Sequence, residues 1–302
     1  MAKLISMPTT PNFNTSFFTL VRTVGTTVSP FTGKTKTQEF DGVYWMAEVS
    51  LPPMSRSQAV EWQSFLTELN GPVNHFKFSD PDALTKRGTF SGAQFATENR
   101  INQTSATVSF TASTNTVATA SNTTPFTNVL VGDFIVITGA TNEANNGTHK
   151  VLTKANAYTI TVDPVANESL VDESNVSGCT IKCNVKGATG LCLKATGNSG
   201  TGTIIKGDYL GVSDSATIDA SGYTPAQYLI TTQDATETNN GGSAKNQFAI
   251  RTEPKLRSTI ASGTKIYITP AKGKFRLVSK EVNWSADRIS LYGISFTCVE
   301  VI

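Results

Sequence analysis

Side chains able to do acid–base or nucleophilic chemistry are few and scattered in this chain of 302 residues. The two histidines, His75 and His149, each lack the sequence context of a catalytic triad. Asp133 and Asp208 each follow a glycine at the start of a predicted strand. Their carboxylates could bind a metal or transfer a proton, but bonding to nearby backbone amides is the commoner role at such a turn. We therefore expect a protein that is not an enzyme.

Two further stretches resemble ligand-binding sites only in composition. The glycine-rich stretch 197–202 lacks the Gly-Lys-Ser/Thr ending of a phosphate-binding loop, and a predicted strand follows it where such a loop needs a helix. The acidic residues of 163–173 lack the spacing of a calcium loop. We interpret both stretches as surface turns or loops, and we expect no cofactor and no metal.

The four cysteines predict buried, reduced thiols. Four cysteines in a chain of this length do not make a disulfide framework. Cys179 and Cys183 lie on one face of a predicted strand, roughly 13 Å apart, which is too far for them to bond to each other. Cys192 follows nearby, and Cys298 lies in the last predicted strand.

The composition excludes several classes of protein. Charged residues make up 16% of the chain, which is too little for a coiled coil, and the 38% of hydrophobic residues suffices for a core. The formal net charge of +2 gives no overall field that would gather nucleic acid or an acidic membrane. The first residues lack the apolar core of a signal peptide, and no run approaches the ~18 apolar residues of a membrane span. We expect folding in a cytoplasm, with no membrane partner and no sequence-specific nucleic acid.

The stretch 43–80 predicts a strand, a helix and a second strand. Ser55, with Gln58 three residues later, forms the capping-box pattern of a helix over 55–70, and apolar residues at spacings of three and four give that helix one buried stripe. Pro52-Pro53 ends the first strand, and Gly71 ends the helix. The large apolar residues of this stretch, together with a later tryptophan, are the expected anchors of the core or of an interface: Trp45, Trp62, Phe65, Leu66, Leu69, Phe76, Phe78 and Trp284.

Much of the remaining chain predicts short strands separated by turn residues. The segments 126–166 and 206–250 share the order Gly-Asp, strand, Asn-Asn-Gly, strand. In the first segment Asn145-Asn146-Gly147 predicts a hairpin, because both turn positions tolerate positive φ; Asn239-Asn240-Gly241 is its counterpart in the second. Two such segments are too few for a solenoid, so we interpret them as two small barrel-like or sandwich-like units.

These patterns predict a mainly β protein, with a β-sandwich or barrel core, one packed α-helix and an inserted small β domain. The stretch 101–125 is uncharged and rich in Ser and Thr, which marks a change of character. We expect residues 1–100 and 177–302 to form the core and residues 101–176 to form the insert. An apolar strand over 291–302 predicts that this segment is joined to a sheet.

One block of residues runs from Val43-Tyr44-Trp45-Met46 to Pro52-Pro53-Met54, then through Ala59-Val60-Glu61-Trp62-Gln63-Ser64-Phe65-Leu66, Leu69-Asn70-Gly71 and Phe76-Lys77-Phe78-Ser79-Asp80-Pro81. This block resembles the start of distal tail or baseplate-type tail proteins of long-tailed, siphovirus-like bacteriophages. A second block is similar to the C-terminal half of the same group; it comprises Lys206-Gly207-Asp208-Tyr209, 250–257, Gly273-Lys274-Phe275-Arg276-Leu277 and 294–300. The blocks cover about two thirds of the chain at the level of pattern.

The resemblance implies a structural virion protein that forms a ring, usually a homohexamer, between the tail tube and the tail-tip hub. Its partners would be copies of itself, the tail tube protein, the hub protein and other baseplate or fibre proteins. It would be located in the virion, at the tail tip, after assembly in the host cytoplasm. The short strands agree with this expectation, because strand edges need covering and a closed ring covers them without open-ended growth.

Alternatives to this interpretation stay open. The insert could be a carbohydrate- or receptor-binding module, although its aromatic residues mostly fall in strand-core positions: Phe110, Phe126, Phe134 and Tyr158. A tail-associated hydrolase would need paired carboxylates, or a nucleophile with a base, in one cleft. The basic residues Lys255, Arg257, Lys272, Lys274 and Arg276 form either a solvated face or a patch in an assembly that passes DNA.

Overall fold

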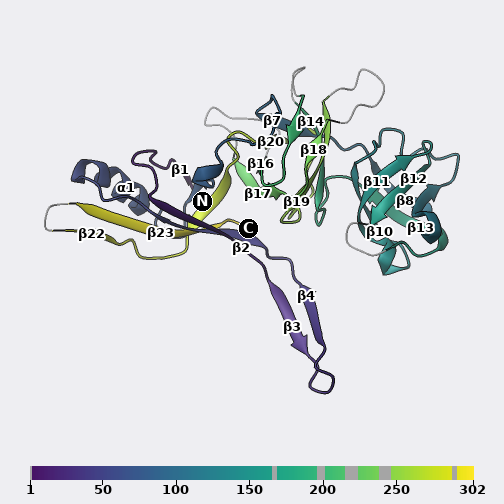
Figure 1. Cartoon of the computed structure of the whole chain (residues 1–302), viewed down its shortest axis with the longest axis horizontal. Helices are drawn as coiled ribbons and strands as arrows, with labels where there is room; N and C mark the ends of the chain where they lie inside the picture. The colour runs from purple at the N-terminus through teal and green to yellow at the C-terminus, as the bar shows by residue number, and fades with distance from the viewer. Residues whose placement is uncertain (1, 165–168, 196–200, 215–223, 238–245, 288–290) are drawn as a thin grey trace. The chain divides into compact units, whose positions relative to one another are not determined.

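The structure, a computed structural model, divides into two compact units (Figure 1). It describes residues 2–164, 169–195, 201–214, 224–237, 246–287 and 291–302. We name the first unit the sheet unit; it contains 1–84, 224–228 and 271–302. The second, the barrel unit, contains 85–223 and 229–270.

The sheet unit is built on a seven-stranded sheet with the order β1-β6-β21-β23-β5-β2, in which β22 also pairs with β23. β1 runs parallel to β6, and the other neighbours are antiparallel. The bounds are β1 Leu4–Ile5, β2 Thr15–Val21, β5 Tyr44–Ser50, β6 His75–Phe78, β21 Gly273–Leu277, β22 Trp284–Ala286 and β23 Tyr292–Glu300. The sheet is open, with β1 and β2 at its two edges.

The α-helix α1 (Arg56–Glu68) packs on this sheet through the apolar stripe that its sequence predicts. At its start Gln58 Oε1 accepts a hydrogen bond of 3.3 Å from the backbone N–H of Ser55, as in a capping box. At its end Asn70 and Gly71 have φ of 50° and 61°, the left-handed conformation that terminates helices. The predicted helix is confirmed.

Aromatic rings fill the space between the helix and the sheet. The ring of Phe78 contacts the ring of Phe18 with centroids 5.4 Å apart, and it contacts the ring of Phe275 at 5.5 Å. On the helix side the ring of Phe65 lies 5.4 Å from the ring of Phe76. Because these rings come from α1, β2, β6 and β21, their contacts join the helix to strands far apart in the sequence.

A buried carboxylate fixes the segment 224–228 in the sheet unit. Glu300 Oε1 accepts a hydrogen bond of 2.7 Å from the backbone N–H of Tyr228, and its Oε2 accepts one of 3.3 Å from the backbone N–H of Trp45. The Trp45 indole N–H donates to the Tyr228 carbonyl at 2.9 Å. Three strands, β5, β17 (Pro225–Thr231) and β23, therefore meet at one carboxylate.

A two-stranded ribbon extends beyond the sheet from its edge pair β2 and β5 (Figure 1). It consists of β3 (Val24–Val28) and β4 (Thr35–Glu39), which pair only with each other among the described strands. The Phe40 N–H donates to the Thr23 carbonyl at 2.9 Å, so hydrogen bonding continues toward the sheet. We name residues 24–39 the hairpin.

The barrel unit contains two closed six-stranded barrels, with the orders β10-β11-β12-β9-β8-β13 and β14-β19-β17-β16-β20-β7. The first comprises β8 Asn102–Thr111, β9 Thr116–Thr119, β10 Phe134–Thr138, β11 Gly147–Lys154, β12 Thr159–Pro164 and β13 Glu173–Lys182. The second comprises β7 Gln94–Thr97, β14 Gly190–Ala195, β16 Tyr209–Ser213, β17, β19 Gln247–Glu253 and β20 Lys265–Tyr267. A short pair, β15 (Thr203–Ile204) and β18 (Ala235–Thr236), and the 3-10 helices η1 Pro81–Ala83, η2 Ala112–Thr114 and η3 Glu143–Asn145 complete the elements.

The two barrels have the same topology. When β8, β9, β10, β11, β12 and β13 are matched in chain order with β7, β14, β16, β17, β19 and β20, neighbours in one barrel are neighbours in the other. The first barrel lies within the connection from β7 to β14, the first two strands of the second. The repeat is therefore nested, and the two segments that share a Gly-Asp pattern occupy equivalent places.

The Gly-Asp pattern forms the same corner in both barrels. Gly132 has φ of 94°, its N–H donates to the Val151 carbonyl at 2.8 Å, and the Val151 N–H donates to the Asp133 carbonyl at 2.8 Å. Gly207 has φ of 92° and, with Asp208 and Thr231, repeats both bonds at 2.8 Å. Each turn needs positive φ, which favours glycine, and each aspartate lies directly before the following strand.

The predicted fold class is confirmed: the chain is mainly β, with one packed helix, a sheet and barrels. The division of the chain differs from the expected one in two places. The first barrel ends with β13 at Lys182, so a boundary at 176 falls inside a strand. Residues 1–100 and 177–302 do not form one core, because they are divided between the two units.

The hairpin predicted at Asn145-Asn146-Gly147 is present, because β10 and β11 pair antiparallel on either side of it, but its turn is not the expected one. The connection from β10 to β11 is longer and includes η3, and only Gly147 of the three has positive φ. The side-chain amide of Asn146 bonds instead to the backbone N–H and carbonyl of Ala140. The counterpart at 239–241 and the glycine-rich stretch up to residue 200 lie outside the described residues.

We expect Trp62→Ala to destabilise the sheet unit by about 3–5 kcal/mol, because the indole is fully buried among aromatic rings and its removal leaves a cavity. Urea unfolding followed by circular dichroism measures the change. Val60→Ala on the same helix is the control, since Val60 is 49% exposed and should cost far less. Equal losses for the two variants would contradict the packing described.

Candidate functional sites

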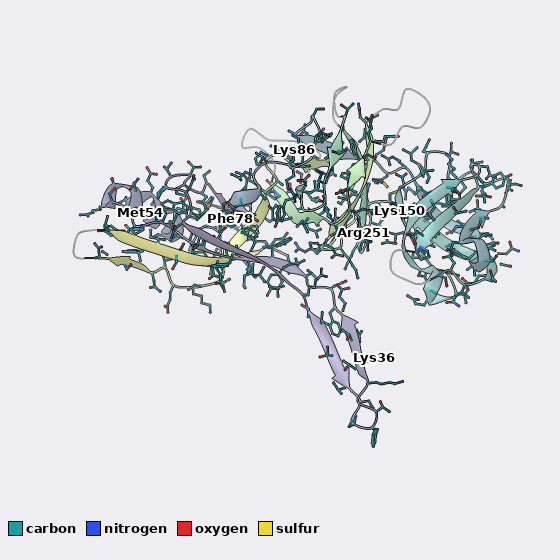
Figure 2. All side chains as sticks on the ribbon, viewed as in Figure 1. Lys36, Met54, Phe78, Lys86, Lys150 and Arg251 are labelled. Carbon is teal, nitrogen blue, oxygen red and sulfur yellow. The ribbon has the colours of Figure 1, made fainter. Side chains whose placement is uncertain are left out.

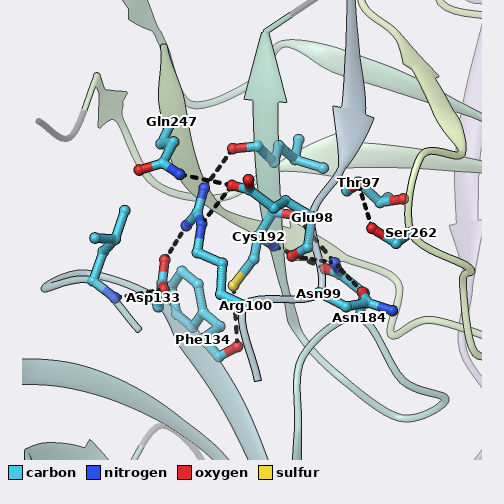
Figure 3. A network of polar contacts seen from close by, with 12 residues as sticks. Thr97, Glu98, Asn99, Arg100, Asp133, Phe134, Asn184, Cys192, Gln247 and Ser262 are labelled. Carbon is cyan, nitrogen blue, oxygen red and sulfur yellow. Dashed lines mark hydrogen bonds and ion pairs between the residues drawn. The ribbon is translucent and has the colours of Figure 1, made fainter. Parts of the chain in front are cut away.

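A buried polar network lies where the two barrels meet (Figure 3). Its centre is Arg100, whose side chain is 1% exposed and lies in the segment between β7 and β8. Its Nη1 donates to Asp133 Oδ1, its Nη2 donates to the Leu193 carbonyl at 2.6 Å, and its Nε donates to Glu98 Oε2 at 2.9 Å. Asp133 belongs to the first barrel and Leu193 to the second, so one guanidinium joins the two.

Amide side chains extend this network into the second barrel. Gln247 Nε2 donates to Glu98 Oε2 at 2.8 Å. Asn184 pairs with the backbone of Cys192 as a strand would: its Oδ1 accepts from the N–H at 2.8 Å, and its Nδ2 donates to the carbonyl at 3.0 Å. Asn184 lies just after β13, the last strand of the first barrel, and its side chain bonds this connection to the backbone of β14 in the second barrel.

A glycine lets the barrels approach each other closely. A Cβ at Gly190 would lie 2.1 Å from Cγ of the Phe134 ring, which is far inside contact distance. Beside it Cys192 Sγ donates to the Phe134 carbonyl at 3.4 Å. The Arg100–Asp133 pair is buried beside this packing, and the low local dielectric strengthens its interaction.

Burial sets the electrostatics of the network. Burial raises the pKa of the Asp133 carboxyl, and the charge of Arg100 and the Leu130 amide offset part of that rise. Burial also acts to lower the pKa of Arg100, but the carboxylates of Asp133 and Glu98 outweigh it and the pKa is raised. The pKa of the Cys192 thiol is raised, mainly by a hydrogen bond with Cys183 and secondly by burial. Each guanidinium nitrogen already donates to a protein acceptor, so the arrangement is suited to holding two barrels together.

The four cysteines are buried and unbonded, which agrees with the predicted reduced thiols. Cys179 lies in β13, and Cys298 lies in β23 of the sheet unit. Burial holds the pKa of the Cys298 thiol far above its usual range. A buried thiol of this kind is chemically inert at neutral pH.

His149 is buried near the start of β11, close to the connection from β10. Its Nε2 lies 3.0 Å from the Asn145 carbonyl, and its Nδ1 has no hydrogen-bond partner. Burial lowers the pKa of this imidazole, although the bond to Asn145 opposes the change. His149 is therefore neutral at pH 7, and protonation would place a charge in an apolar core.

A groove of about 500 Å³ opens on the sheet unit. β23 pairs with β22 through 292–294 and with β21 through 298–300, and the connection 278–283 leaves a break in the sheet between them. The side chains around this break are both apolar and acidic; they include Phe17, Glu48, Val278, Glu281 and Thr297. Among the described residues that line it there is no Lys or Arg.

The hairpin is a second exposed surface of the sheet unit (Figure 2). Of its strand residues only Gly25 is partly shielded, and Phe31 at the tip is 96% exposed. Lys34 and Lys36 give the distal part a positive charge, and Lys36 is labelled there in Figure 2. At the base Arg22 and Glu39 form an exposed ion pair of 3.4 Å.

A basic strip runs across β6 and β21. Lys77 and Lys274 are direct register partners, and His75 and Arg276 lie two residues along on the same face. Burial, and then the charges of Lys274 and Arg276, lower the pKa of His75. Of the other basic residues singled out, Lys272 belongs to the same unit, whereas Lys255 and Arg257 belong to the barrel unit.

The structure places most of the predicted anchors together in one core. The buried ones are Trp45, Trp62, Phe65, Leu66, Leu69, Phe76 and Phe78. Trp284 is not a core anchor, because it is 47% exposed on β22, a three-residue strand with no buried position. Its indole remains available to a partner.

The two aspartates take the backbone-bonding role that their turns predict. Asp133 Oδ2 accepts from the Leu130 N–H at 2.8 Å, and Asp208 Oδ2 accepts from the Ile205 N–H at 3.1 Å. The pairing of Asp133 with Arg100 was not foreseen. The second oxygen of Asp208 accepts from the backbone N–H of Arg87 at 2.8 Å, so within the described residues the ion pair is found at the corner of the first barrel alone.

Comparison with protein-family models and with curated protein sequences finds no match for this chain. Among the described residues no group of three His, Cys, Asp or Glu side chains could hold a metal ion. Within the same residues no helix has the length and apolar character needed to cross a membrane.

We expect Arg100→Met to destabilise the barrel unit by about 3–5 kcal/mol, because Asp133 would keep a buried charge without its partner. Circular dichroism in urea is the suitable measurement, since all three tryptophans lie in the sheet unit. The double variant Arg100→Met, Asp133→Asn should recover part of the loss, because Asn still accepts from Leu130. A double variant as unstable as the sum of the two single variants would contradict the pairing.

We expect the stability of the first barrel to fall as the pH drops below about 6.5, the usual pKa of histidine in an unfolded chain. The folded pKa of His149 is lowered, so in this range the unfolded state binds more protons and is favoured. The fall in urea midpoint between pH 7.5 and pH 5.5 should be smaller in His149→Gln than in the natural chain. His75→Gln, in the sheet unit, separates the contribution of the other histidine, and an unchanged fall in His149→Gln would reject this explanation.

Proposed function

We propose that the chain is a structural component of a phage tail tip, a distal tail protein that forms a ring joining the tail tube to the tail-tip hub and baseplate. The observation that carries the proposal is the open sheet with its exposed hairpin, which leaves backbone edges and apolar side chains for neighbouring subunits. The barrels need no such neighbours, because closure pairs every strand on both sides.

The two sheet edges support a ring. Among the described strands β1 pairs only with β6 and β2 only with β5, so each edge presents backbone groups that no described strand pairs with. On β2 the outward side chain of Phe17 is 66% exposed. The two edges differ in sequence, and a contact between two different surfaces generates a ring when its rotation closes.

The hairpin supports the same proposal. An isolated two-stranded ribbon is at best marginally stable in water, and this one packs on no other described strand. An aromatic side chain at such a tip, fully exposed as Phe31 is, is typical of a contact made in an assembly. Copies of the same chain and the adjoining tube, hub, baseplate or fibre proteins are the partners we propose, with six copies as the expected ring.

Most of the residues that resemble tail proteins belong to the sheet unit. The stretch 43–82 makes β5, α1 and β6, and the later segments 273–277 and 294–300 make β21 and most of β23. These strands are neighbours in one sheet, whereas the other segments of the resemblance, 206–209 and 250–257, lie in the barrel unit. Residence in the virion and assembly in the host cytoplasm are parts of the same proposal.

The carbohydrate-binding alternative has no observation in its favour. Sugar sites commonly use exposed aromatic platforms, and Phe110, Phe126 and Phe134 of the first barrel are all buried. Tyr158 is only partly exposed. We therefore propose no carbohydrate ligand and no catalytic role.

The proposal is tested on particles of the phage that encodes the chain. Immunogold labelling with antibody raised against the purified chain should mark the tail tip, and mass spectrometry of purified particles should find the chain in a small, fixed copy number. Deleting residues 29–34 should leave the fold of the chain intact, as the hairpin contributes no core residue, but should reduce its incorporation into particles. Particles that lack the chain, or that carry it along the whole tail, would contradict the proposal.

A further inference from the structure

We infer that the tip of the hairpin of one copy docks in the groove of a neighbouring copy of the same chain. The inference deepens the proposed function and rests on it, because that function supplies the second copy. It depends on two surfaces of the sheet unit, each described above, that are complementary in polarity and in charge.

The hairpin tip carries exposed apolar side chains next to two positively charged ones. Phe31 is 96% exposed, and the nearby Val28 is also exposed. Lys34 and Lys36 follow within five residues of Phe31. Among the described residues neither ammonium group has a hydrogen bond or an ion pair. Both charges are therefore available to an external carboxylate.

The groove has the opposite character. Its apolar surface includes Phe17, Val278 and Val282, and its volume of about 500 Å³ lies in the range of cavities that enclose small ligands. Glu48 and Glu281 supply its charges, and within the described part of the chain neither carboxylate has a partner. The aromatic ring of Phe31 suits the apolar part of the groove, and the two lysines of the hairpin equal in number the two glutamates of the groove.

The contact must be made between copies. In the single chain Phe31 is exposed, so the hairpin does not occupy the groove of its own sheet unit. The hairpin and the groove are different surfaces, and a contact between them is heterologous, which closes into a ring or continues as a filament. Opposite charges on the two surfaces also orient the approach of the subunits and weaken with salt.

Cross-linking between two different variants tests the contact directly. Thr32→Cys places a thiol beside Phe31, and Asn283→Cys places one in the groove lining, while the four natural cysteines are buried. A mixture of the two full-length variants, treated with a short bismaleimide, should give a covalent dimer that contains one copy of each. Replacing Asn283→Cys by Leu152→Cys, an exposed position outside both surfaces, is the matched control. A yield no higher than that of the control overturns the inference.

Charge reversal tests the pairing of the two surfaces. Lys34→Glu with Lys36→Glu in the Thr32→Cys variant should lower the cross-linking yield at least tenfold, and Glu48→Lys with Glu281→Lys in the partner variant should restore it. Lys3→Glu with Lys194→Glu has the same net charge and should leave the yield unchanged. A loss without restoration overturns the assignment of the carboxylates.

These outcomes are separate from those that test the proposed function. A cross-link between copies of a chain that is absent from particles supports the docking and contradicts the tail-tip role. A chain found at the tail tip whose variants do not cross-link keeps the role and overturns the docking.

Discussion

The requirement that every backbone hydrogen-bonding group find a partner governs this molecule. The barrel unit meets it internally, because each of its two barrels closes and leaves no edge. The sheet unit meets it only in part: the ladder ends at β1 and β2, and it breaks along β23 between the pairing with β22 and with β21. One chain therefore joins a self-contained unit to one whose surface is incomplete. The surfaces that suggest assembly, namely the edges, the break and the hairpin, all belong to the sheet unit.

Buried carboxylates accept hydrogen bonds from backbone N–H groups that no neighbouring strand pairs with. Glu300 takes two backbone N–H groups in the sheet unit, and Asp133 and Asp208 each take the N–H three residues earlier at a barrel corner. The cost of burying such a charge is offset by these bonds and, at Asp133, by Arg100. The equivalent corner of the second barrel binds a backbone amide of Arg87 instead. The ion pair is thus an addition to a shared corner, made where two barrels must be held together.

Local signals in the sequence predicted local structure well. The helix followed from its capping box and its apolar spacing, and the Gly-Asp pattern predicted both the turn and the repeat of small barrels. Distant pairings were beyond reach: Arg100 lies 33 residues from Asp133 and 93 from Leu193, and no pattern marks such partners. Of the predicted core or interface anchors, Trp284 is exposed, because a large residue is buried only when its strand is covered and β22 lies at the margin of the sheet. The Asn-Asn-Gly turn failed because Asn146 bonds across a longer loop.

The position of the hairpin connects the two ways in which the sheet unit could meet a neighbour. β2 is an edge strand, and β3 begins three residues after it ends; β4 likewise precedes β5 by a short connection. The hairpin therefore continues the ribbon formed by β2 and β5, and Phe40 bonds back to Thr23 at the joint. A neighbour that pairs with the β2 edge would fix the direction in which the hairpin points. A neighbour that binds the hairpin tip would in turn fix the twist of the β2 edge. Either contact favours the other, because both constrain one continuous pair of strands.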